Sequence, residues 1–216
     1  MKIPSATDHV IYLDTETPLG LMRLAARACA ANEVSGPTRQ LANRPTARDP
    51  DSDDTVVALS GAWFLDQSDL PAPSDAWQQD TQHPILRQAQ TELTEWFAGQ
   101  RREFDVALAP QGTLFQQAVW QALLDLSFGT TCSYSDLASA IGKPKSFRAA
   151  AQAIGRNPIS IFIPCHRVVG RDSSLTGFGG GLPRKQALLQ HEGHRYPGHH
   201  ARVRRIDNSQ LALPWQ

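Results

Sequence analysis

Residues 135–155 read SDLASAIGKPKSFRAAAQAIG. A helical apolar pattern ends at the turn 142–145, and a second helical segment, 147–154, follows with Ser146 in position to cap it. Two short helices joined by a Gly-containing turn are typical of a helix-turn-helix. An ordinary helical hairpin that packs its alanines inward would have the same pattern. In either case the stretch predicts a mainly helical fold for this part of the chain.

Two further helices are predicted on either side of this stretch. Thr113 with Gln116 three residues later forms a capping box, which opens a helix whose apolar face consists of Leu114, Phe115, Val119, Trp120, Leu123 and Leu124. Downstream, Pro183 begins a helix that reaches Glu192. We therefore expect a helical C-terminal domain over residues 111–195, followed by a tail, 196–216.

The first part of the chain has the composition and turn signals of strands. Short β-rich runs occupy residues 10–13, 21–24 and 56–65, and the turn 17–20 joins the first two into a hairpin. Pro84 then opens an amphipathic helix that ends at Gly99. Strands followed by a helix predict a small α/β N-terminal domain over residues 1–110.

One segment of this domain has no apolar period. From Arg27 to Thr55 the residues are mostly Ala, Asn, Pro, Arg, Ser and Asp. A polar stretch of this length buries too little apolar surface to be ordered by itself. We therefore expect a flexible surface insertion at about residues 27–55.

The formal net charge of the 216 residues is zero, but the charges are divided unevenly. Residues 1–112 hold 9 Lys and Arg against 16 Asp and Glu, whereas residues 113–216 hold 12 against 5. A basic half indicates contact with nucleic acid. Two domains that attract each other, or drift in surface composition, would give the same division.

Apolar residues make up 41% of the chain, which is enough for a core. No apolar run approaches the roughly 18–20 residues of a membrane span, and the first residues lack the apolar region of a secretion signal. The three cysteines, Cys29, Cys132 and Cys165, form no obvious disulfide framework, which fits free thiols in a reducing compartment. These observations predict a cytoplasmic protein without membrane contact.

The densest chemical motif is residues 157–170, NPISIFIPCHRVVG. An apolar run is followed at once by Cys165, His166 and Arg167. Neighbouring cationic groups lower the pKa of a thiol, and the thiolate is a strong nucleophile. A buried inert thiol would fit the same spacing. Glu192 could orient His166 in a Cys-His-acid relay, with a surface glutamate at a helix end as the alternative.

Other candidate sites are weaker. Cys29 and Cys132 have no neighbouring base, so we expect both to be structural thiols. The chain has no C-x-x-C pair and no H-x-x-x-H pattern, and we expect no metal and no cofactor. Histidines near the C-terminal end could hold a metal loosely, but we prefer a solvated tail for His191, His194, His199 and His200.

The motif 163–168, IPCHRV, resembles the active-site signature of O6-alkylguanine-DNA alkyltransferases, also called methylated-DNA–protein-cysteine methyltransferases. The likeness covers about residues 113–193 closely, and residues 17–20 and 63–67 resemble the first domain of bacterial members more loosely. Further motifs of the family are matched at Phe115…Val119-Trp120, Ser133-Tyr134…Leu137-Ala138, Ile141-Gly142-Lys143-Pro144, Arg148-Ala149, Asn157-Pro158, Thr176-Gly177-Phe178 and Lys185…Leu188-Leu189…Glu192.

The resemblance implies an α/β N-terminal domain followed by a mainly helical, winged helix-turn-helix-like C-terminal domain. It implies that Cys165 accepts an alkyl group, that His166 activates the thiol through a water, and that Glu192 holds His166. Asn157 would tie together the turn that precedes the active-site segment. Tyr134 would help to turn the nucleotide out of the duplex and would protonate the guanine as it leaves.

The same resemblance implies the binding partner. The protein would bind double-stranded DNA through the minor groove as a monomer. Arg148 would be inserted into the duplex, with further DNA contacts from Tyr134, Ser146, Ala149 and Gln152. The everted base would lie in a pocket formed by Pro164, Val168, Phe178, Gly179 and Lys185.

The implied function is DNA repair. The alkyl group of O6-alkylguanine, and also of O4-alkylthymine, would pass irreversibly to Cys165, after flipping of the damaged nucleotide. The thioether product is not hydrolysed under mild conditions, so each protein molecule would act once. Two alternatives remain: a lesion-binding protein of the alkyltransferase-like class, which lacks the acceptor cysteine, and a cysteine hydrolase that uses Cys165 and His166.

The sequence also departs from the family pattern. The segment 27–55 has no counterpart in the family core, and Ser173 stands where many members have glycine. Phe178 replaces a common tyrosine, and Gly179 replaces a residue with a side chain, so larger alkyl groups would fit. The tail contains three arginines that could contact phosphates, namely Arg202, Arg204 and Arg205. We prefer the interpretation that the tail is solvated.

Overall fold

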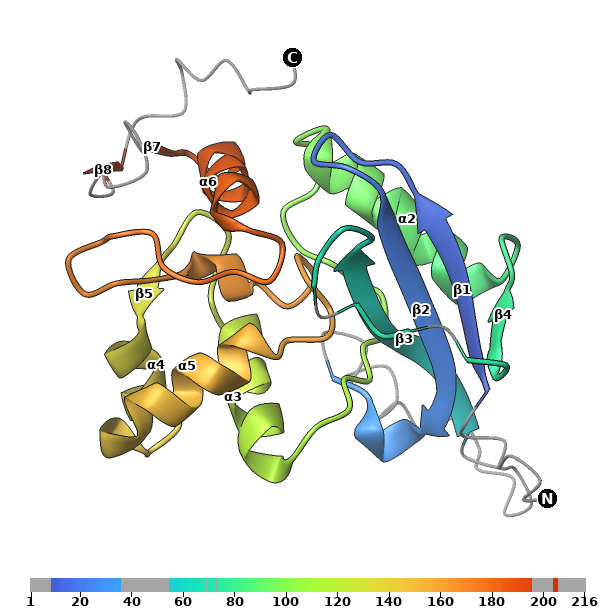
Figure 1. The fold of residues 1–216 in the computed structure, drawn as a ribbon, viewed down its shortest axis with the longest axis horizontal. Coiled ribbons are helices and arrows are strands. Elements are labelled where there is room, and N and C mark those ends of the chain that lie inside the picture. The colour runs from blue at the N-terminus through green and yellow to red at the C-terminus, as the bar shows by residue number, and fades with distance from the viewer. Residues whose placement is uncertain (1–8, 36–54, 69, 73, 196–203, 206–216) are drawn as a thin grey trace.

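The computed structural model describes residues 9–35, 55–68, 70–72, 74–195 and 204–205. Its N-terminal part is a four-stranded sheet with the strand order β3-β2-β1-β4. Strands β1, β2 and β3 are antiparallel neighbours, and β4 runs parallel to β1. Helix α2 covers one face of this sheet (Figure 1). The bounds are β1 Val10–Thr15, β2 Met22–Ala30, β3 Thr55–Phe64, β4 Trp77–Gln79 and α2 Pro84–Phe97.

The predicted hairpin is confirmed. Thr17 and Gly20 exchange backbone hydrogen bonds of 3.2 and 3.0 Å, and the Thr17 hydroxyl donates to the Gly20 carbonyl at 2.6 Å. Gly20 has a φ of +117°, a conformation that glycine adopts without strain. The turn therefore sets the antiparallel register that runs from Thr15↔Met22 to Val10↔Arg27.

The predicted insertion is wrong at its first residues. Strand β2 continues to Ala30, a 3-10 helix (Ala31–Glu33) follows, and Val34 is buried. The alanines carry no apolar period, but β2 is paired with β3 as far as Ala30↔Thr55, and this tertiary context outweighs the weak propensity of Ala for strands. Residues 36–54 of the predicted insertion lie outside the described residues.

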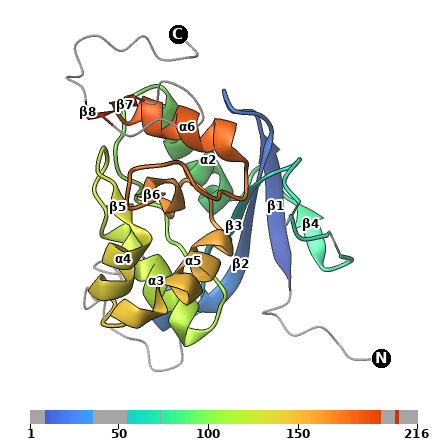
Figure 2. The same cartoon turned by 60° about the vertical axis from the view of Figure 1, so that its left-hand side comes forward.

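The C-terminal part is mainly helical, as predicted. Helices α3, α4 and α5 pack against one another (Figure 2), and a short parallel strand pair, β5–β6, lies beside them. The elements are α3 Leu114–Leu124, β5 Cys132–Ser133, α4 Tyr134–Ala140, η3 Pro144–Ser146, α5 Phe147–Gly155, η4 Cys165–Arg167, β6 Val168–Val169, α6 Leu182–His191, β7 His194–Arg195 and β8 Arg204–Arg205.

The helix caps agree with the sequence in one case and differ in two. The capping box of Thr113 and Gln116 is confirmed. A second capping box, Ser133 with Asp136, starts α4 at Tyr134, one residue before the predicted start at Ser135. Ser146 makes no capping hydrogen bond, because a 3-10 turn leads into α5 and leaves Ser146 near φ −97° and ψ 23°, away from the extended backbone of an N-cap.

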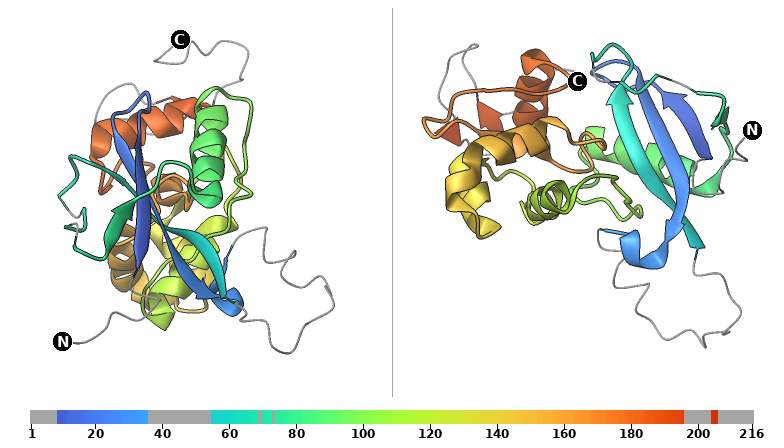
Figure 3. Two further views of the ribbon diagram at one scale, coloured as in Figure 1. Left: turned by 90° about the vertical axis from the view of Figure 1, so that its right-hand side faces the viewer. Right: turned by 60° about the horizontal axis from the view of Figure 1, so that its bottom comes forward.

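The sheet and the helices lie side by side (Figure 3) and share one hydrophobic core. Side chains from both parts belong to a single buried cluster, which includes Leu24, Phe64, Trp96, Trp120, Ile154 and Ile163. Within the residues described above, no helix combines the length and apolar character that crossing a membrane requires.

Leu24→Ala tests this core. Leu24 is fully buried in β2, so its truncation should lower the free energy of unfolding by about 2–5 kcal/mol. The neighbouring Leu21 is 43% exposed, and Leu21→Ala should change it by less than about 0.5 kcal/mol. Urea unfolding followed by circular dichroism measures both variants; equal losses would contradict the packing.

Candidate functional site

The motif 157–170 is attached to the sheet at one end and to the helices at the other. The amide of Ala62, in β3, donates to the Pro158 carbonyl at 2.9 Å, and the Ser160 amide donates back to the Ala62 carbonyl at 2.9 Å. The chain then turns through Ile161, which has a φ of 75°, and enters the 3-10 turn that carries Cys165. These bonds hold the cysteine between the two parts of the fold.

Asn157 fixes the turn around Cys165. Its amide nitrogen donates to the Ile163 carbonyl at 2.9 Å and to the Cys165 sulfur at 3.1 Å. Its carbonyl oxygen accepts from the Ile159 amide at 3.0 Å. One buried side chain therefore positions both ends of the turn and the thiol, which is itself only 5% exposed.

Behind the cysteine lies a buried cluster of His166, Arg167 and Glu192. His166 Nε2 lies 2.9 Å from Glu192 Oε1, and the Arg167 guanidinium meets the same carboxylate through Nε at 2.9 Å and Nη2 at 2.8 Å. The Gly129 amide donates to Glu192 Oε2 at 3.1 Å. The structure thus brings together His166 and Glu192, and it adds Arg167, whose pairing with Glu192 has no signal in the sequence.

Electrostatics within the cluster fix the protonation states. Burial alone raises the pKa of the Glu192 carboxyl, but the attraction of His166 and Arg167 outweighs it and lowers that pKa to about 2. Burial lowers the pKa of His166, so its ring is neutral near pH 7. The ionised carboxylate accepts the proton at Nε2, which leaves Nδ1 as the acceptor nitrogen. Among the described residues Nδ1 is buried and has no hydrogen-bond partner.

The cysteine is not activated in the way the sequence suggests. Burial raises the pKa of the Cys165 thiol, and the Asn157 amide and the Lys185 charge offset only part of this effect. Arg167 is bound to Glu192 and His166 is neutral, so neither neighbour supplies the expected cationic charge. The thiol therefore needs a base to remove its proton during a reaction.

Tyr134 and Lys185 hold the segment that follows β6. The Thr176 hydroxyl donates to the Tyr134 oxygen at 2.9 Å. Lys185 Nζ donates to the carbonyls of Val168 and Thr176 at 2.6 Å each and to that of Gly177 at 3.3 Å. Burial raises the pKa of the Tyr134 hydroxyl, which stays protonated, and lowers the pKa of Lys185 to about 8.

A small pocket opens beside the sulfur, with a volume of about 10 Å³. This is room for about one water. It contains the predicted Phe178 and Gly179 but not Pro164, Val168 or Lys185, and it adds Gln67 from the N-terminal part. The lining residues are Gln67, Ile154, Gly155, Asn157, Ser160, Cys165, Gly177, Phe178 and Gly179.

Helix α5 presents the predicted DNA-contacting residues on its outer face. Arg148, Ala149 and Gln152 are exposed, whereas Ser146 is partly buried. The opposite face is buried against α3 and α4, and consists of Ala150, Ala153 and Ile154. Ala150 and Ala153 thus pack inward, as in an ordinary helical hairpin, whereas Ala149 lies on the exposed face beside Arg148.

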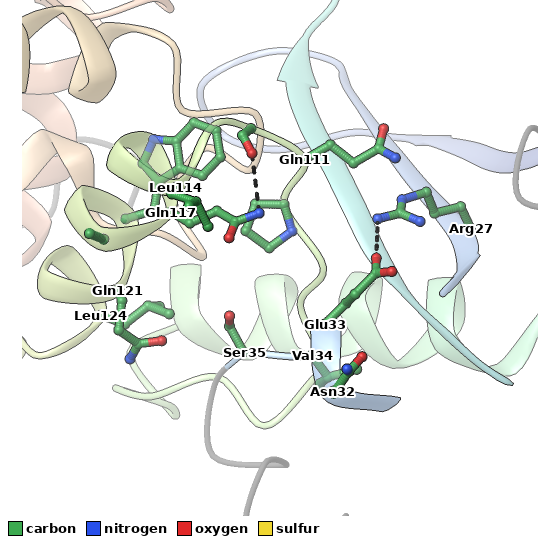
Figure 4. Close-up of a pocket in the computed structure, with 14 residues that line it drawn as sticks. Arg27, Asn32, Glu33, Val34, Ser35, Gln111, Leu114, Gln117, Gln121 and Leu124 are labelled. Atoms are coloured by element: carbon green, nitrogen blue, oxygen red, sulfur yellow. Dashed lines mark hydrogen bonds and ion pairs between the residues drawn. The ribbon is translucent and has the colours of Figure 1, made fainter. Parts of the chain in front are cut away.

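A groove beside α3 is a separate feature. It has a volume of about 660 Å³ and lies between α3 and the end of β2 (Figure 4). The Arg27–Glu33 ion pair, 2.9 Å long, forms one side, and glutamines of α3 form the other. None of the predicted site residues lines this groove, and the sulfur of Cys165 lies elsewhere.

The histidines at the end of α6 are not a solvated tail. His191 and His194 are buried, and His191 Nε2 lies 2.7 Å from the Trp96 carbonyl, with its ring 4.2 Å from the Trp96 ring. The aromatic side chains of α2 cover the His191 ring. His199 and His200 lie outside the described residues, and the part of the chain that is described contains no cluster able to hold a metal.

Comparisons with known proteins agree on one family. Residues 114–194 match the family model described as 6-O-methylguanine DNA methyltransferase, DNA binding domain. A methylated-DNA–protein-cysteine methyltransferase of Haemophilus influenzae is 45% identical over 122 residues, which are 56% of this chain and 68% of the relative. The Mycobacterium tuberculosis protein of the same name is 52% identical over 106 residues, 49% of this chain and 64% of the relative.

Solved structures give the same result. The crystal structure of Mycobacterium tuberculosis OGT in complex with DNA matches with a TM-score of 0.66 at 36% sequence identity. The match covers 84% of this chain and 92% of that chain, and so includes the sheet as well as the helices.

The Glu192 cluster predicts an acid-sensitive stability. The pKa of this carboxyl is about 2 in the folded chain and an ordinary 4.5 when unfolded, so its stabilisation is present above pH 4.5 and is lost as the pH falls towards 2. Between pH 5 and pH 3, protonation of Glu192 alone should lower the free energy of unfolding of the wild type by about 2 kcal/mol. Glu192→Gln should not show this loss. Urea unfolding at both pH values measures it.

Glu33→Gln is the matched control, because it removes an ion-pair carboxylate whose side chain is 50% exposed. Between the two pH values, the free energy of unfolding of Glu33→Gln should fall by as much as that of the wild type. If Glu192→Gln had the same pH dependence as the wild type, the carboxylate would not be the group that stabilises the folded site.

Proposed function

The chain belongs to the methylated-DNA–protein-cysteine methyltransferases, a family of DNA-binding DNA repair proteins, and on this basis we propose that Cys165 takes an alkyl group directly from O6-alkylguanine in duplex DNA. The observation that carries the proposal is the arrangement of the thiol. A buried cysteine held by Asn157, a neutral His166 paired with Glu192, and a pocket at the sulfur form one continuous site.

The proposed reaction begins with proton transfer. His166 Nδ1 accepts the Cys165 proton through a water, and the Glu192 carboxylate stabilises the imidazolium that forms. The sulfur attacks the alkyl carbon, so that the S–C bond forms as the C–O6 bond breaks. Tyr134, protonated at neutral pH, donates a proton to the departing guanine.

The thioether product explains why the protein would act once. Water does not hydrolyse a thioether under mild conditions, and this family's reaction consumes the acceptor thiol. The same site chemistry applies to O4-alkylthymine, whose alkyl carbon is bonded to a comparable oxygen. We propose both as substrates, with one molecule of protein consumed for each lesion.

Access to the alkyl carbon requires that the nucleotide leave the stack, at a cost of a few kcal/mol. We propose that α5 enters the minor groove as the recognition helix of a winged helix-turn-helix in the domain 111–195, that the domain 1–110 supports it, and that the protein binds as a monomer. Arg148 would fill the vacated space, a use of inserted side chains known from minor-groove proteins. Ser146, Ala149 and Gln152 would lie along the DNA backbone.

The base would lie against Phe178 and Gly179, with backbone contacts near Val168 and with Pro164 and Lys185 forming the rear of the pocket. A volume of about 10 Å³ does not hold a purine, so the pocket has to widen when the base enters. The lesion-binding alternative is disfavoured because Cys165 is present. A hydrolase would need repeated turnover on an ester or amide.

Mass spectrometry tests the acceptor. Incubation with a duplex that carries one O6-methylguanine should add one methyl group to the intact protein, and Cys165→Ala should abolish the gain. Cys132→Ala is the control, because Cys132 does not line the pocket at the Cys165 sulfur and its replacement should leave methyl transfer intact. No gain with the DNA still bound would favour the lesion-binding class, and multiple turnovers of an ester would favour the hydrolase.

Kinetics test the inserted side chain. Arg148→Ala should slow alkyl transfer from duplex DNA at least about 10-fold more than transfer from a free alkylguanine base, because only the duplex requires flipping. Arg87→Ala removes an exposed arginine from α2 and should affect neither substrate. Equal slowing on both substrates would remove the proposed role of Arg148.

A further inference from the structure

One wall of the pocket at Cys165 comes from the N-terminal part of the chain. Gln67 lies just beyond β3 and is 8% exposed. Its side chain lines the same small pocket as Cys165, Phe178 and Gly179. No property of the sequence around residue 67 indicates this, because the pocket is assembled from segments about 100 positions apart.

The Gln67 side chain is held in place by its own turn. The Phe64 amide donates to Gln67 Oε1 at 3.0 Å, and the Gln67 amide donates to the Phe64 carbonyl at 3.2 Å. To swing away from the pocket, the side chain would have to leave the buried Phe64 amide without this partner, and a buried amide without a hydrogen bond destabilises the fold. Gln67 is therefore a fixed wall.

The turn is also fixed against the opposite wall of the pocket. Arg184, on α6, donates to the Leu19 carbonyl at 2.8 Å and to the Gly180 carbonyl at 3.1 Å, and pairs with Asp66 at 2.9 Å. Its guanidinium lies 4.2 Å from the centre of the Phe64 ring. The residues on both sides of the pocket are thus joined through one arginine.

Little slack remains between these walls. A Cβ atom placed on Gly180 would lie 2.8 Å from the Phe64 ring and 2.8 Å from the Phe178 ring. The free volume at the sulfur is about 10 Å³. Gly179 contributes no side chain, and Gln67 is the lining residue that comes from the N-terminal part, so truncation of its side chain enlarges the space available to an alkyl group.

We propose that Gln67 sets the upper size of the alkyl group that Cys165 accepts. The inference rests on the proposed function, because it concerns the group that is transferred to this thiol. A methyl group needs little room, whereas a benzyl group adds a ring to the pocket at the sulfur, of which Gln67 is one wall. Gln67 is a specificity-determining residue and takes no part in the transfer of protons.

The test compares rates of alkyl transfer from duplexes that carry O6-methylguanine or O6-benzylguanine. Gln67→Ala should raise the ratio of the benzyl rate to the methyl rate at least about 10-fold, since relief of a steric limit of one or more methylene groups is worth this much. Gln67→Leu keeps most of the side-chain volume and should leave the ratio within about 2-fold of the wild type.

Both substitutions remove the hydrogen-bond partner of the Phe64 amide, so both should lower the free energy of unfolding by a similar amount. Urea unfolding of the two variants measures this effect. Gln90→Ala is a further control, because Gln90 bonds Thr15 at 3.0 Å away from the pocket and should not change the ratio. An unchanged ratio in Gln67→Ala, or an equal rise in Gln67→Leu, would overturn the size limit alone. Absence of transfer from both duplexes to the wild type would overturn the proposed function as well.

Discussion

Two basic side chains, those of His166 and Arg167, meet a single buried carboxylate, that of Glu192. Without Glu192 the guanidinium would be a buried charge with no counter-ion, which destabilises proteins by several kcal/mol. The same carboxylate chooses the tautomer of His166 and so points an acceptor nitrogen away from the cluster. Since Glu192 follows α6 and also accepts from the Gly129 amide, it joins three segments around the turn that carries Cys165.

The groups that exchange protons in the proposed reaction are uncharged before it begins. The thiol and the Tyr134 hydroxyl keep their protons because burial raises both pKa values, and the His166 ring is neutral because burial lowers its pKa. In the proposed reaction, charge develops only when the proton moves and the sulfur attacks. The Glu192 carboxylate is already in place for the imidazolium, an arrangement that needs no reorganisation at that moment.

Short-range patterns in the sequence predicted much of the fold. The 17–20 hairpin, the Thr113–Gln116 cap and the helix-turn-helix spacing each depend on residues a few positions apart, and each is present. Ser173, where the family pattern has glycine, adopts a φ of 64°, a region that favours glycine. Local chemistry is sufficient for features of this kind.

The failures concern contacts that are distant in the sequence. The β2 extension through Ala30 depends on pairing with β3, about 25–30 positions away, and the Arg167–Glu192 pair joins residues 25 positions apart. The raised pKa of the Cys165 thiol comes from burial, which adjacency to His166 and Arg167 does not reveal. Phe178 and Gly179, expected from the family resemblance to form the base pocket, line the pocket at the sulfur, but no signal in the sequence indicated that Gln67 lines it too.

The hydrophobic cluster that includes Leu24, Trp96 and Ile163 has a consequence for how the molecule can be divided. A cut between the sheet and the helices would expose apolar side chains on both fragments, and it would also break the backbone bonds of Ala62 with Pro158 and Ser160. The strand that supports the turn of Cys165 would then be missing from the fragment that carries the thiol. The two parts should therefore unfold as one cooperative unit. Loosening of the sheet would also disturb the turn that carries Cys165.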